Sequence, residues 1–310
     1  MEEKKFTLEK QLKGIRRNIS LTEYTTFKIG GKAKYFFIAR TKEELIRAVQ
    51  AAGKLNLPFF ILGGGSNILV SDKGFDGLVI KTQNTKYTIP RTRASSVRGR
   101  QNTKITAESG MPLALLVSET TKNNLSGLEW AVGIPGTVGG AIYGNAGTKE
   151  EAIGGVVKEV EVFNIKTKRI KKFSKKDCRF NYRESIFKKN NNLIILSVVF
   201  QLKKGKESEI KNRIKENLQS RKEKQPLNFP SAGSVFKNPS GFFAGKLIQD
   251  CGLKGKRIGN VKISEKHANF IVNLGGGKAK DVKKLINLIE NKVKKKFGIV
   301  LEEEIQFLGF

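Results

Sequence analysis

GLEWAVGIPGTVGGAIYGNAG, residues 127–147, is the stretch of this sequence that most constrains the fold. It contains seven glycines and one proline, with apolar side chains such as Leu128, Trp130 and Ile142 between them. Because glycine tolerates positive φ and allows close backbone approach, such a segment can press its main chain against a flat ring. Bare backbone N–H groups also bind phosphate. The stretch therefore predicts a binding loop for a cofactor with a ring and a pyrophosphate, and a tight turn between core segments is the alternative.

A second glycine loop follows an expected strand. Thr41 and Glu44 form a capping box that opens a helix, and the apolar strand 59–62 comes next and runs into Gly63-Gly64-Gly65-Ser66-Asn67. Loops at the carboxyl ends of strands are favoured ligand positions in α/β sheets. The loop is not a GxGxxG fingerprint, because Ile68 occupies the third glycine position, and it is not a P-loop. A phosphate-facing loop is predicted, and a simple turn remains the alternative.

The composition predicts an ordinary globular protein of two or three domains. The chain has 310 residues, of which 38% are hydrophobic and 28% charged. Its net charge of +31 should attract anionic substrates. Nucleic-acid binding is an alternative, but lysine is scattered over every segment instead of clustering on one element. Residues 85–104, which include Arg91, Arg93, Arg98 and Arg100, are expected to form an exposed basic loop.

Cysteine usage and the apolar runs bear on the cellular compartment. Cys178 and Cys251 lie far apart, without metal-ligand spacing or a CxxC motif. The first ten residues are charged, and the longest apolar run, 193–200, contains Ser197 and is far too short to cross a bilayer. We therefore expect a reduced, cytoplasmic protein with no membrane span and no metal site.

Hydrophobic periodicity and capping signals predict the remaining elements. Asp281 is expected to cap a long helix that buries Val282, Leu285, Ile286, Ile289, Val293 and Phe297 and stops at Gly298. A final strand, 299–308, is expected to carry Glu302, Glu303 and Glu304. The other expected elements are a helix and strand within 1–24, strands at 34–39, 78–81, 105–108 and 267–272, several strands within 155–200, and helices at 112–122, 207–225 and 242–251. The helix after Thr41 is expected to end at Gly53. The helix 112–122 is expected to carry Leu113, Leu116, Val117 and Thr120 along one face, and the helix 207–225 an apolar stripe of Ile210, Ile214 and Leu218.

Eight motifs occur in order along the chain: TTFKIGG (25–31), LGGGSNIL (62–69), GLEWAVGIPGTVGGAIYGNAG (127–147), NYRES (181–185), SAGSVFKNP (231–239), AGKLIQDCGLKG (244–255), HANFIVN (267–273) and GIVLEEEIQFLG (298–309). With them the sequence resembles the UDP-N-acetylenolpyruvoylglucosamine reductase (MurB) family. The resemblance is to the shorter form, which lacks an insertion in the substrate domain. The Arg-rich segment 91–101 departs from the family pattern, in which that hairpin is shorter.

The resemblance implies an α+β fold. An FAD-binding region of the PCMH/VAO type would consist of two subdomains, residues 1–84 and 85–204, and an α+β substrate-binding domain would follow at 205–310. It also implies non-covalent FAD, NADPH as hydride donor, and UDP-N-acetylglucosamine enolpyruvate as the substrate that becomes UDP-N-acetylmuramate. That product serves peptidoglycan synthesis, and through it cell shape and division. A cytoplasmic monomer that binds neither nucleic acid nor membrane is expected.

The resemblance assigns the cofactor to the two glycine loops. The expected FAD-binding residues are Gly63, Gly64, Gly65, Ser66, Asn67, Ile134, Pro135, Gly136, Thr137, Gly139 and Gly140. His267 is the only histidine of the chain, so no covalent flavin link through a histidine near the first loop is expected.

Three residues are expected to carry the chemistry. Hydride addition to the terminal carbon of the enolpyruvyl group builds negative charge beside a carboxylate, which needs prepositioned cationic or acidic groups. Arg183 would bind the carboxylate, unless it only pairs with a neighbour such as Glu184. Glu304 would act as an acid toward the enolate, with a raised pKa, unless it is an exposed strand carboxylate; Glu302 is a less favoured candidate.

Ser234 would donate the proton that completes the reaction, unless it merely caps a turn. Lys237 and Asn238 are expected to contact the substrate diphosphate or sugar, and His267 is a weaker substrate-binding candidate. A related FAD-dependent oxidase of the same fold, acting on another substrate, is the alternative function.

Overall fold

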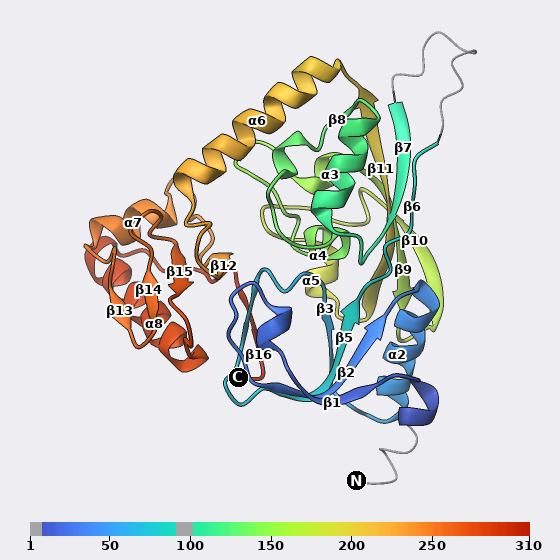
Figure 1. The fold of residues 1–310 in the computed structure, drawn as a ribbon, viewed down its shortest axis with the longest axis horizontal. Coiled ribbons are helices and arrows are strands. Elements are labelled where there is room, and N and C mark those ends of the chain that lie inside the picture. The colour runs from blue at the N-terminus through green and yellow to red at the C-terminus, as the bar shows by residue number, and fades with distance from the viewer. Residues whose placement is uncertain (1–7, 91–101) are drawn as a thin grey trace. The chain divides into compact units, whose positions relative to one another are not determined.

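The computed structural model describes residues 8–90 and 102–310 (Figure 1). Its contacts divide the chain into two compact units, each built from separate pieces of sequence. Unit 1 comprises Met1–Gly14, Phe37–Gly63 and Ile80–Ser220, and unit 2 comprises Ile15–Phe36, Gly64–Val79 and Arg221–Phe310. The division expected from the resemblance, at residues 84 and 204, stays a prediction.

Two strands contribute residues to both units. β2 (Lys32–Ala39) and β5 (Phe75–Thr82) are neighbours in a four-stranded sheet of order β1-β2-β5-β3. β1 (Arg16–Ser20) and β3 (Phe59–Leu62) are its edges. The strands expected here are present, and β2 and β5 begin earlier than predicted. The chain thus passes from one unit to the other within continuous strands.

The Thr41 half of the predicted capping box forms, but the Glu44 carboxylate accepts the Arg40 N–H at 2.7 Å and not that of Thr41. The Thr41 hydroxyl accepts the Glu44 N–H at 3.1 Å and opens α2 (Lys42–Lys54), which buries Leu45 and Val49. Such a cap stabilises a helix by about 1 kcal/mol. The sequence predicts that this helix ends at Gly53, but the helix includes Gly53 and ends at Lys54.

The larger sheet lies in unit 1 and has the order β10-β9-β11-β7-β6, with β8 also pairing with β11. Its strands are β6 (Tyr87–Thr88), β7 (Asn102–Glu108), β8 (Leu125–Ser126), β9 (Val157–Asn164), β10 (Arg169–Ser174) and β11 (Leu193–Lys204). α3 (Leu113–Lys122), α4 (Val138–Tyr143) and α5 (Ile186–Lys189) belong to the same unit, and α4 packs on β11 and β7. Short 3₁₀ turns occur at Thr22–Tyr24, Glu129–Ala131 and Ile153–Gly155.

α3 follows the sequence pattern closely, whereas α6 (Glu207–Lys224) does not. α3 buries the four predicted side chains, Leu113, Leu116, Val117 and Thr120. In α6 only Ile210 of the expected apolar stripe is buried, and Leu218 is 44% exposed. The charged residues of α6 dominate its surface, so its helical period did not indicate a buried face.

The sequence predicts a loop over the whole of 85–104, but parts of this segment form strands. Tyr87 and Thr88 form β6, which pairs with Ala107 and Thr106 of β7, and β7 already begins at Asn102. The pairing satisfies backbone groups that a loop would leave to water. The predicted basic loop at Arg91, Arg93, Arg98 and Arg100 lies outside the described residues.

Unit 2 contains a four-stranded sheet of order β12-β15-β14-β13. Its strands are β12 (Ser231–Ser234), β13 (Arg257–Ile258), β14 (Val261–Ile263) and β15 (Phe270–Asn273). α7 (Ala244–Asp250) and α8 (Ala279–Phe297) pack beside it and on one another. β15 begins three residues later than expected, so His267 precedes the strand.

α8 begins at Ala279, and Asp281 does not cap it. Its N-cap residue, Lys278, offers no side-chain acceptor, and the distant Asp72 accepts the N–H groups of Ala279 (2.8 Å) and Lys280 (3.0 Å) instead. Gly298 ends the helix at φ +71°, as predicted. Of the six expected apolar side chains, five are buried, but Phe297 at the last turn is 37% exposed.

The predicted C-terminal strand is mostly irregular. Only β16 (Gln306–Leu308) forms, and it pairs in parallel with β4 (Ile68–Val70). Glu302–Glu304 run beside the segment that follows Ser234, with a bridge between Phe236 and Glu303. The carboxylates therefore lie on an irregular segment, where alternation along a strand does not decide which of them faces inward.

Candidate functional site

The first glycine loop and the glycine stretch meet in unit 1. A Cβ added to Gly63 would lie 2.6 Å from Thr137 Oγ1, so only glycine fits there. Thr137 caps α4 by accepting the Gly140 N–H at 3.3 Å. Lys81 Nζ donates to the Gly63 carbonyl at 2.8 Å. These contacts fix the backbone at the end of β3.

The rest of the first loop belongs to unit 2. Gly65 has φ +64°, and a Cβ there would lie 2.1 Å from the Tyr24 carbonyl oxygen. The Gly65 carbonyl accepts the Thr26 N–H at 3.1 Å. Among the described residues, neither Gly64 nor Gly65 donates its N–H to another protein group. A tightly held loop with spare N–H groups fits a phosphate-bearing cofactor.

The N–H groups of Gly139 and Gly140, in the middle of the glycine stretch, donate within the protein. The Gly139 N–H donates to the Ser109 carbonyl at 2.8 Å, and a Cβ on Gly139 would lie 2.8 Å from Ser109 Cβ. Gly136 adopts φ +134°, and its carbonyl accepts the Leu113 N–H. Packing therefore accounts for Gly139. Contact of Ile134, Pro135, Gly136, Thr137, Gly139 and Gly140 with a cofactor stays a prediction.

Ser234 ends β12 next to Gly233, which adopts φ +76°. The backbone beyond it is clamped by Asn269. The Asn269 carbonyl accepts the Val235 N–H at 2.8 Å, and the Asn269 side chain bonds both the N–H (2.9 Å) and the carbonyl (2.8 Å) of Phe236. Ser234 is half-buried, so its hydroxyl sits on a rigid segment.

Glu304 is joined to the same segment. Its N–H donates to the Val235 carbonyl at 2.7 Å, and its own carbonyl accepts Asn67 Nδ2 at 3.0 Å. Unit 2 therefore brings Ser234, Glu304 and Asn67 onto adjoining backbone. Glu304 is half-buried, and its proposed role as an acid stays a prediction.

The two neighbouring glutamates are engaged by lysines. Glu302 pairs with the buried Lys237, and Glu303 with Lys283 at 2.9 Å. Glu302 is itself 71% exposed. The three consecutive carboxylates thus have different environments, which sequence alone did not distinguish.

The weaker substrate candidates also lie in unit 2. Asn238 Oδ1 accepts the Ala244 N–H at 3.0 Å at the start of α7. His267 Nδ1 accepts the Asn269 N–H at 3.3 Å, and its ring meets Phe270 edge-on. Burial lowers the pKa of His267, which favours the neutral imidazole. These contacts give both residues structural roles, and their contact with substrate stays a prediction.

Arg183 lies in unit 1, on a strained turn. It adopts φ +54°, and Asn181 and Glu184 exchange backbone hydrogen bonds across the turn at 3.1 and 3.0 Å. Its Nη2 donates to the Gly147 carbonyl at 3.0 Å, and the guanidinium stacks on Tyr182. A non-glycine residue at positive φ is costly, which is typical of functional sites. Glu184 pairs with Lys189 at 2.7 Å.

Residues 33–171 match the family model described as FAD binding domain, and residues 225–308 match that of the UDP-N-acetylenolpyruvoylglucosamine reductase C-terminal domain. The reductase of that name from Caldicellulosiruptor saccharolyticus is 46% identical over 93% of this chain and 90% of its own length. The chain belongs to the UDP-N-acetylenolpyruvoylglucosamine reductase family.

Other members of this reductase family are also similar to this chain over most of its length. The relative from Lachnoclostridium phytofermentans is 40% identical over 94% of this chain and 92% of its own length. The crystal structure of the Thermus caldophilus reductase (MurB) covers 95% of this chain and 99% of its own, with 36% identity and a TM-score of 0.77. The α+β class and the FAD-binding fold are confirmed, as is the enzyme class, an FAD-containing oxidoreductase of the UDP-N-acetylmuramate dehydrogenase type.

Sequence reasoning overlooked two residues of this reductase, each of which supports a candidate segment within its own unit. Lys81 supports Gly63, and burial lowers its pKa. Its signal is a single lysine within the apolar strand GLVIKT. Asn269 lies inside the recognised motif HANFIVN, but its clamp on Phe236 depends on tertiary contact and leaves no local signal.

Within residues 8–90 and 102–310 of this reductase, no cluster of three or more His, Cys, Asp or Glu side chains is arranged to hold a metal. Over the same ranges, no helix has both the length and the apolar character needed to cross a bilayer. Burial raises the pKa of Cys178 to about 12, so its thiol is a poor nucleophile.

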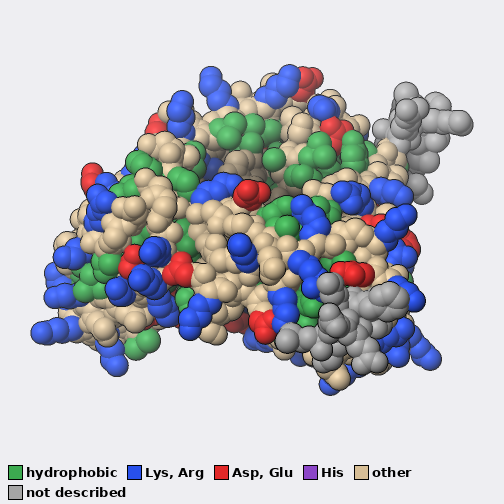
Figure 2. Space-filling view, turned by 60° about the horizontal axis from the view of Figure 1, so that its bottom comes forward, with side chains coloured by type: hydrophobic (Ala, Val, Ile, Leu, Met, Phe, Trp, Pro, Cys, Tyr) green, Lys and Arg blue, Asp and Glu red, His purple; other side chains and the backbone are tan. Residues whose placement is uncertain are grey.

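The strong positive charge is not gathered in one patch on the face shown. Figure 2 shows Lys and Arg side chains spread across it, with Asp and Glu among them. A nucleic-acid reader would instead be expected to concentrate basic residues on one element. The view therefore gives no support to the nucleic-acid alternative, and the expectation that the protein binds none stays a prediction.

Proposed function

We propose that this protein reduces UDP-N-acetylglucosamine enolpyruvate to UDP-N-acetylmuramate, a cytoplasmic step of peptidoglycan precursor synthesis. The family membership supports the reaction. The observation that supports the mechanism is the hydrogen bond from the Glu304 N–H to the Val235 carbonyl, which joins the backbone of the proposed acid to the residue that follows Ser234.

FAD, held without a covalent link, would supply the hydride chemistry, with NADPH as the source of electrons. The residues proposed to hold it are those of the two glycine loops. The crowded Gly63 and Gly65 positions and the spare N–H groups of Gly64 and Gly65 fit a pyrophosphate-bearing group. Lys81 would keep the loop in place through the Gly63 carbonyl.

The reaction adds a hydride to the terminal carbon of the enolpyruvyl group and a proton to the carbon beside the carboxylate. Arg183 would bind the substrate carboxylate with its planar guanidinium. Glu304 would donate a hydrogen bond to the enolate as negative charge develops. Ser234 would then release its hydroxyl proton to the carbon, which is feasible because the enolate is a strong base and the serine is held in place.

Substrate recognition would extend beyond the reacting atoms. Lys237 and Asn238 would contact the diphosphate or sugar, and His267 is a weaker candidate. Lys237 is buried and already pairs with the exposed Glu302, so an anionic ligand would compete for its ammonium group. We propose that the enzyme works as a monomer.

The absorbance spectrum of the purified protein tests this function. We expect a yellow protein whose flavin bands are bleached by NADPH without oxygen and restored by UDP-N-acetylglucosamine enolpyruvate. A protein that binds no flavin would contradict the proposal. Fast restoration by air with peroxide release, and none by the enolpyruvyl compound, would instead favour an oxidase acting on another substrate.

A further inference from the structure

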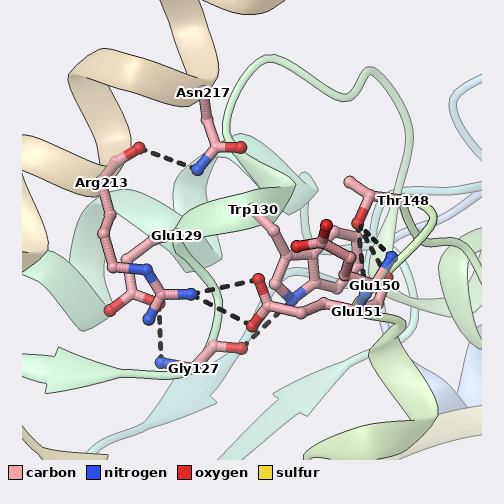
Figure 3. Close-up of polar contacts among 8 residues, drawn as sticks. All are labelled: Gly127, Glu129, Trp130, Thr148, Glu150, Glu151, Arg213 and Asn217. Carbon is pink, nitrogen blue, oxygen red and sulfur yellow. Dashed lines mark hydrogen bonds and ion pairs between the residues drawn. The ribbon is translucent and has the colours of Figure 1, made fainter.

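Arg213 of α6 contacts two carboxylates, one inside the glycine stretch 127–147 and one just beyond its end (Figure 3). Its Nη2 donates to both carboxylate oxygens of Glu151, at 3.2 and 3.1 Å, and its Nη1 lies 3.6 Å from Glu129 Oε2. Glu129 is 2% exposed and accepts the Gly127 N–H at 2.8 Å. A single guanidinium therefore bridges the beginning of the stretch and the turn just beyond its end.

Glu151 closes a tight turn that starts at Thr148. The Thr148 N–H donates to the Glu151 carbonyl at 2.7 Å, and the Thr148 hydroxyl accepts the Glu151 N–H at 3.2 Å. Gly147 forms a bridge with Ala152, and a Cβ on Gly147 would lie 2.4 Å from the Glu151 carbonyl oxygen. The direction of the Gly147 carbonyl therefore depends on where Glu151 is held.

That carbonyl is the acceptor for Arg183 Nη2. Asn145 gives a second link between the same loop and the Arg183 turn, because its side chain accepts the Gly154 N–H at 3.0 Å and donates to the Asn181 carbonyl at 2.8 Å. Contacts thus run without a break from Arg213, through Glu151 and Gly147, to the guanidinium of Arg183. All of these residues belong to unit 1.

From these contacts we infer that Arg213 is a positioning residue for substrate binding. By holding Glu151, it fixes the turn whose Gly147 carbonyl orients Arg183 toward the substrate carboxylate. The inference rests on the proposed role of Arg183. Arginine suits the task because its planar group can serve two carboxylates at once, which the point charge of lysine does less well. A residue that merely fastened α6 would affect stability without affecting substrate affinity.

The test is steady-state kinetics of Arg213→Gln in the full-length, FAD-loaded enzyme, with UDP-N-acetylglucosamine enolpyruvate as the varied substrate. We expect KM to rise about tenfold and kcat to change less than about twofold, because the loss is one of orientation at a binding group. Flavin content per chain should not change. Arg213→Lys should give an intermediate KM.

Lys211→Gln is the matched control. It lies on the same helix, removes the same charge and breaks an ion pair, but its partner Glu207 belongs to α6 itself and both side chains are exposed. Its KM should equal that of the wild type. If Arg213→Gln does not fold, Glu151→Gln should give the same rise in KM, since it removes the same link from the other side.

A double-mutant cycle with Arg183→Gln separates this inference from the proposed function. If Arg213 acts through Arg183, Arg213→Gln should raise KM little further in the Arg183→Gln background. Equal fold-changes in both backgrounds, or an unchanged KM for Arg213→Gln beside a raised KM for Arg183→Gln, would overturn the inference alone. An unchanged KM for Arg183→Gln itself would overturn the proposed role of Arg183 and the inference with it.

Discussion

The backbone of Glu304 donates a hydrogen bond to the carbonyl of Val235, at 2.7 Å. This bond connects the C-terminal segment to the strand end that carries Ser234. The serine and the carboxylate therefore depend on the same pairing, which Asn269 strengthens from the other side by holding Val235 and Phe236. Rigid support of this kind is what proton transfer at a fixed carbon requires.

Ser234→Ala should separate the two half-reactions. Reduction of the flavin by NADPH should proceed as in the wild type, because no proton from Ser234 is needed. Reoxidation by the enolpyruvyl substrate should slow by about a hundredfold or more, the usual contribution of a positioned acid. Stopped-flow absorbance without oxygen measures both rates. Equal slowing of both would argue against Ser234 as the proton donor.

Gly63→Ala should weaken flavin binding and destabilise unit 1, because the new methyl group would lie 2.6 Å from Thr137 Oγ1. Flavin content after purification and thermal unfolding report the two effects. Gly53→Ala is the control, since Gly53 lies inside α2 with open space around it. That variant should gain about 0.5–1 kcal/mol of stability. Full flavin content in Gly63→Ala would show that flavin binding does not depend on the close contact between Gly63 and Thr137.

Asp72→Ala should lower the free energy of unfolding by about 1 kcal/mol, because it removes the side-chain cap of α8. Urea unfolding measures the loss. Asp76→Asn is the control: it removes one negative charge from the same region, but its ion pair with Lys34 is on the surface, so the loss should be small. Equal losses would show that charge, and not capping, matters at Asp72.

His267 should make stability depend on pH in a predictable direction. Burial lowers its folded-state pKa below the ordinary 6.5, so the unfolded chain binds the proton more readily. The contribution of neutral His267 to stability is therefore complete above pH 6.5, and it is lost as the pH falls through that value toward the folded-state pKa. His267→Gln should lose less stability than the wild type between about pH 7 and about pH 5.5.

Urea unfolding at the two pH values gives this difference. Because the chain has one histidine, its imidazole NMR signal can also be titrated without assignment. A folded-state pKa above the ordinary value, or identical pH dependence in His267→Gln, would contradict the expectation.

Local signals in the sequence predicted the elements whose own side chains decide their structure. α3 buries the four predicted residues, and Thr41 caps α2, because hydrophobic period and capping chemistry act within a few residues. Prediction failed where the partner is distant in sequence. Asp72 replaces Asp281 as the cap of α8, and no local pattern links residue 72 to residue 279.

In the candidate site, too, some features could be predicted from the sequence and others depend on partners that are distant in sequence. The resemblance selected Ser234 and Glu304, and the structure joins their segments in unit 2. It did not reveal that Glu302 and Glu303 are taken by Lys237 and Lys283, because pairing across the fold separates three carboxylates that look alike in sequence. The strained conformation of Arg183 is likewise a product of the turn that Asn181 and Glu184 close.

The parallel pairing of β16 with β4 limits which fragments of this chain can fold. A fragment that began at Arg221 would keep β16 but lose residues 68–70, its partner strand, and also Asp72. Its terminal strand would then have an open edge, and its longest helix would begin with unbonded N–H groups. Truncation to the C-terminal family region should therefore give an aggregating product, and dissection experiments need the N-terminal pieces supplied in the same polypeptide.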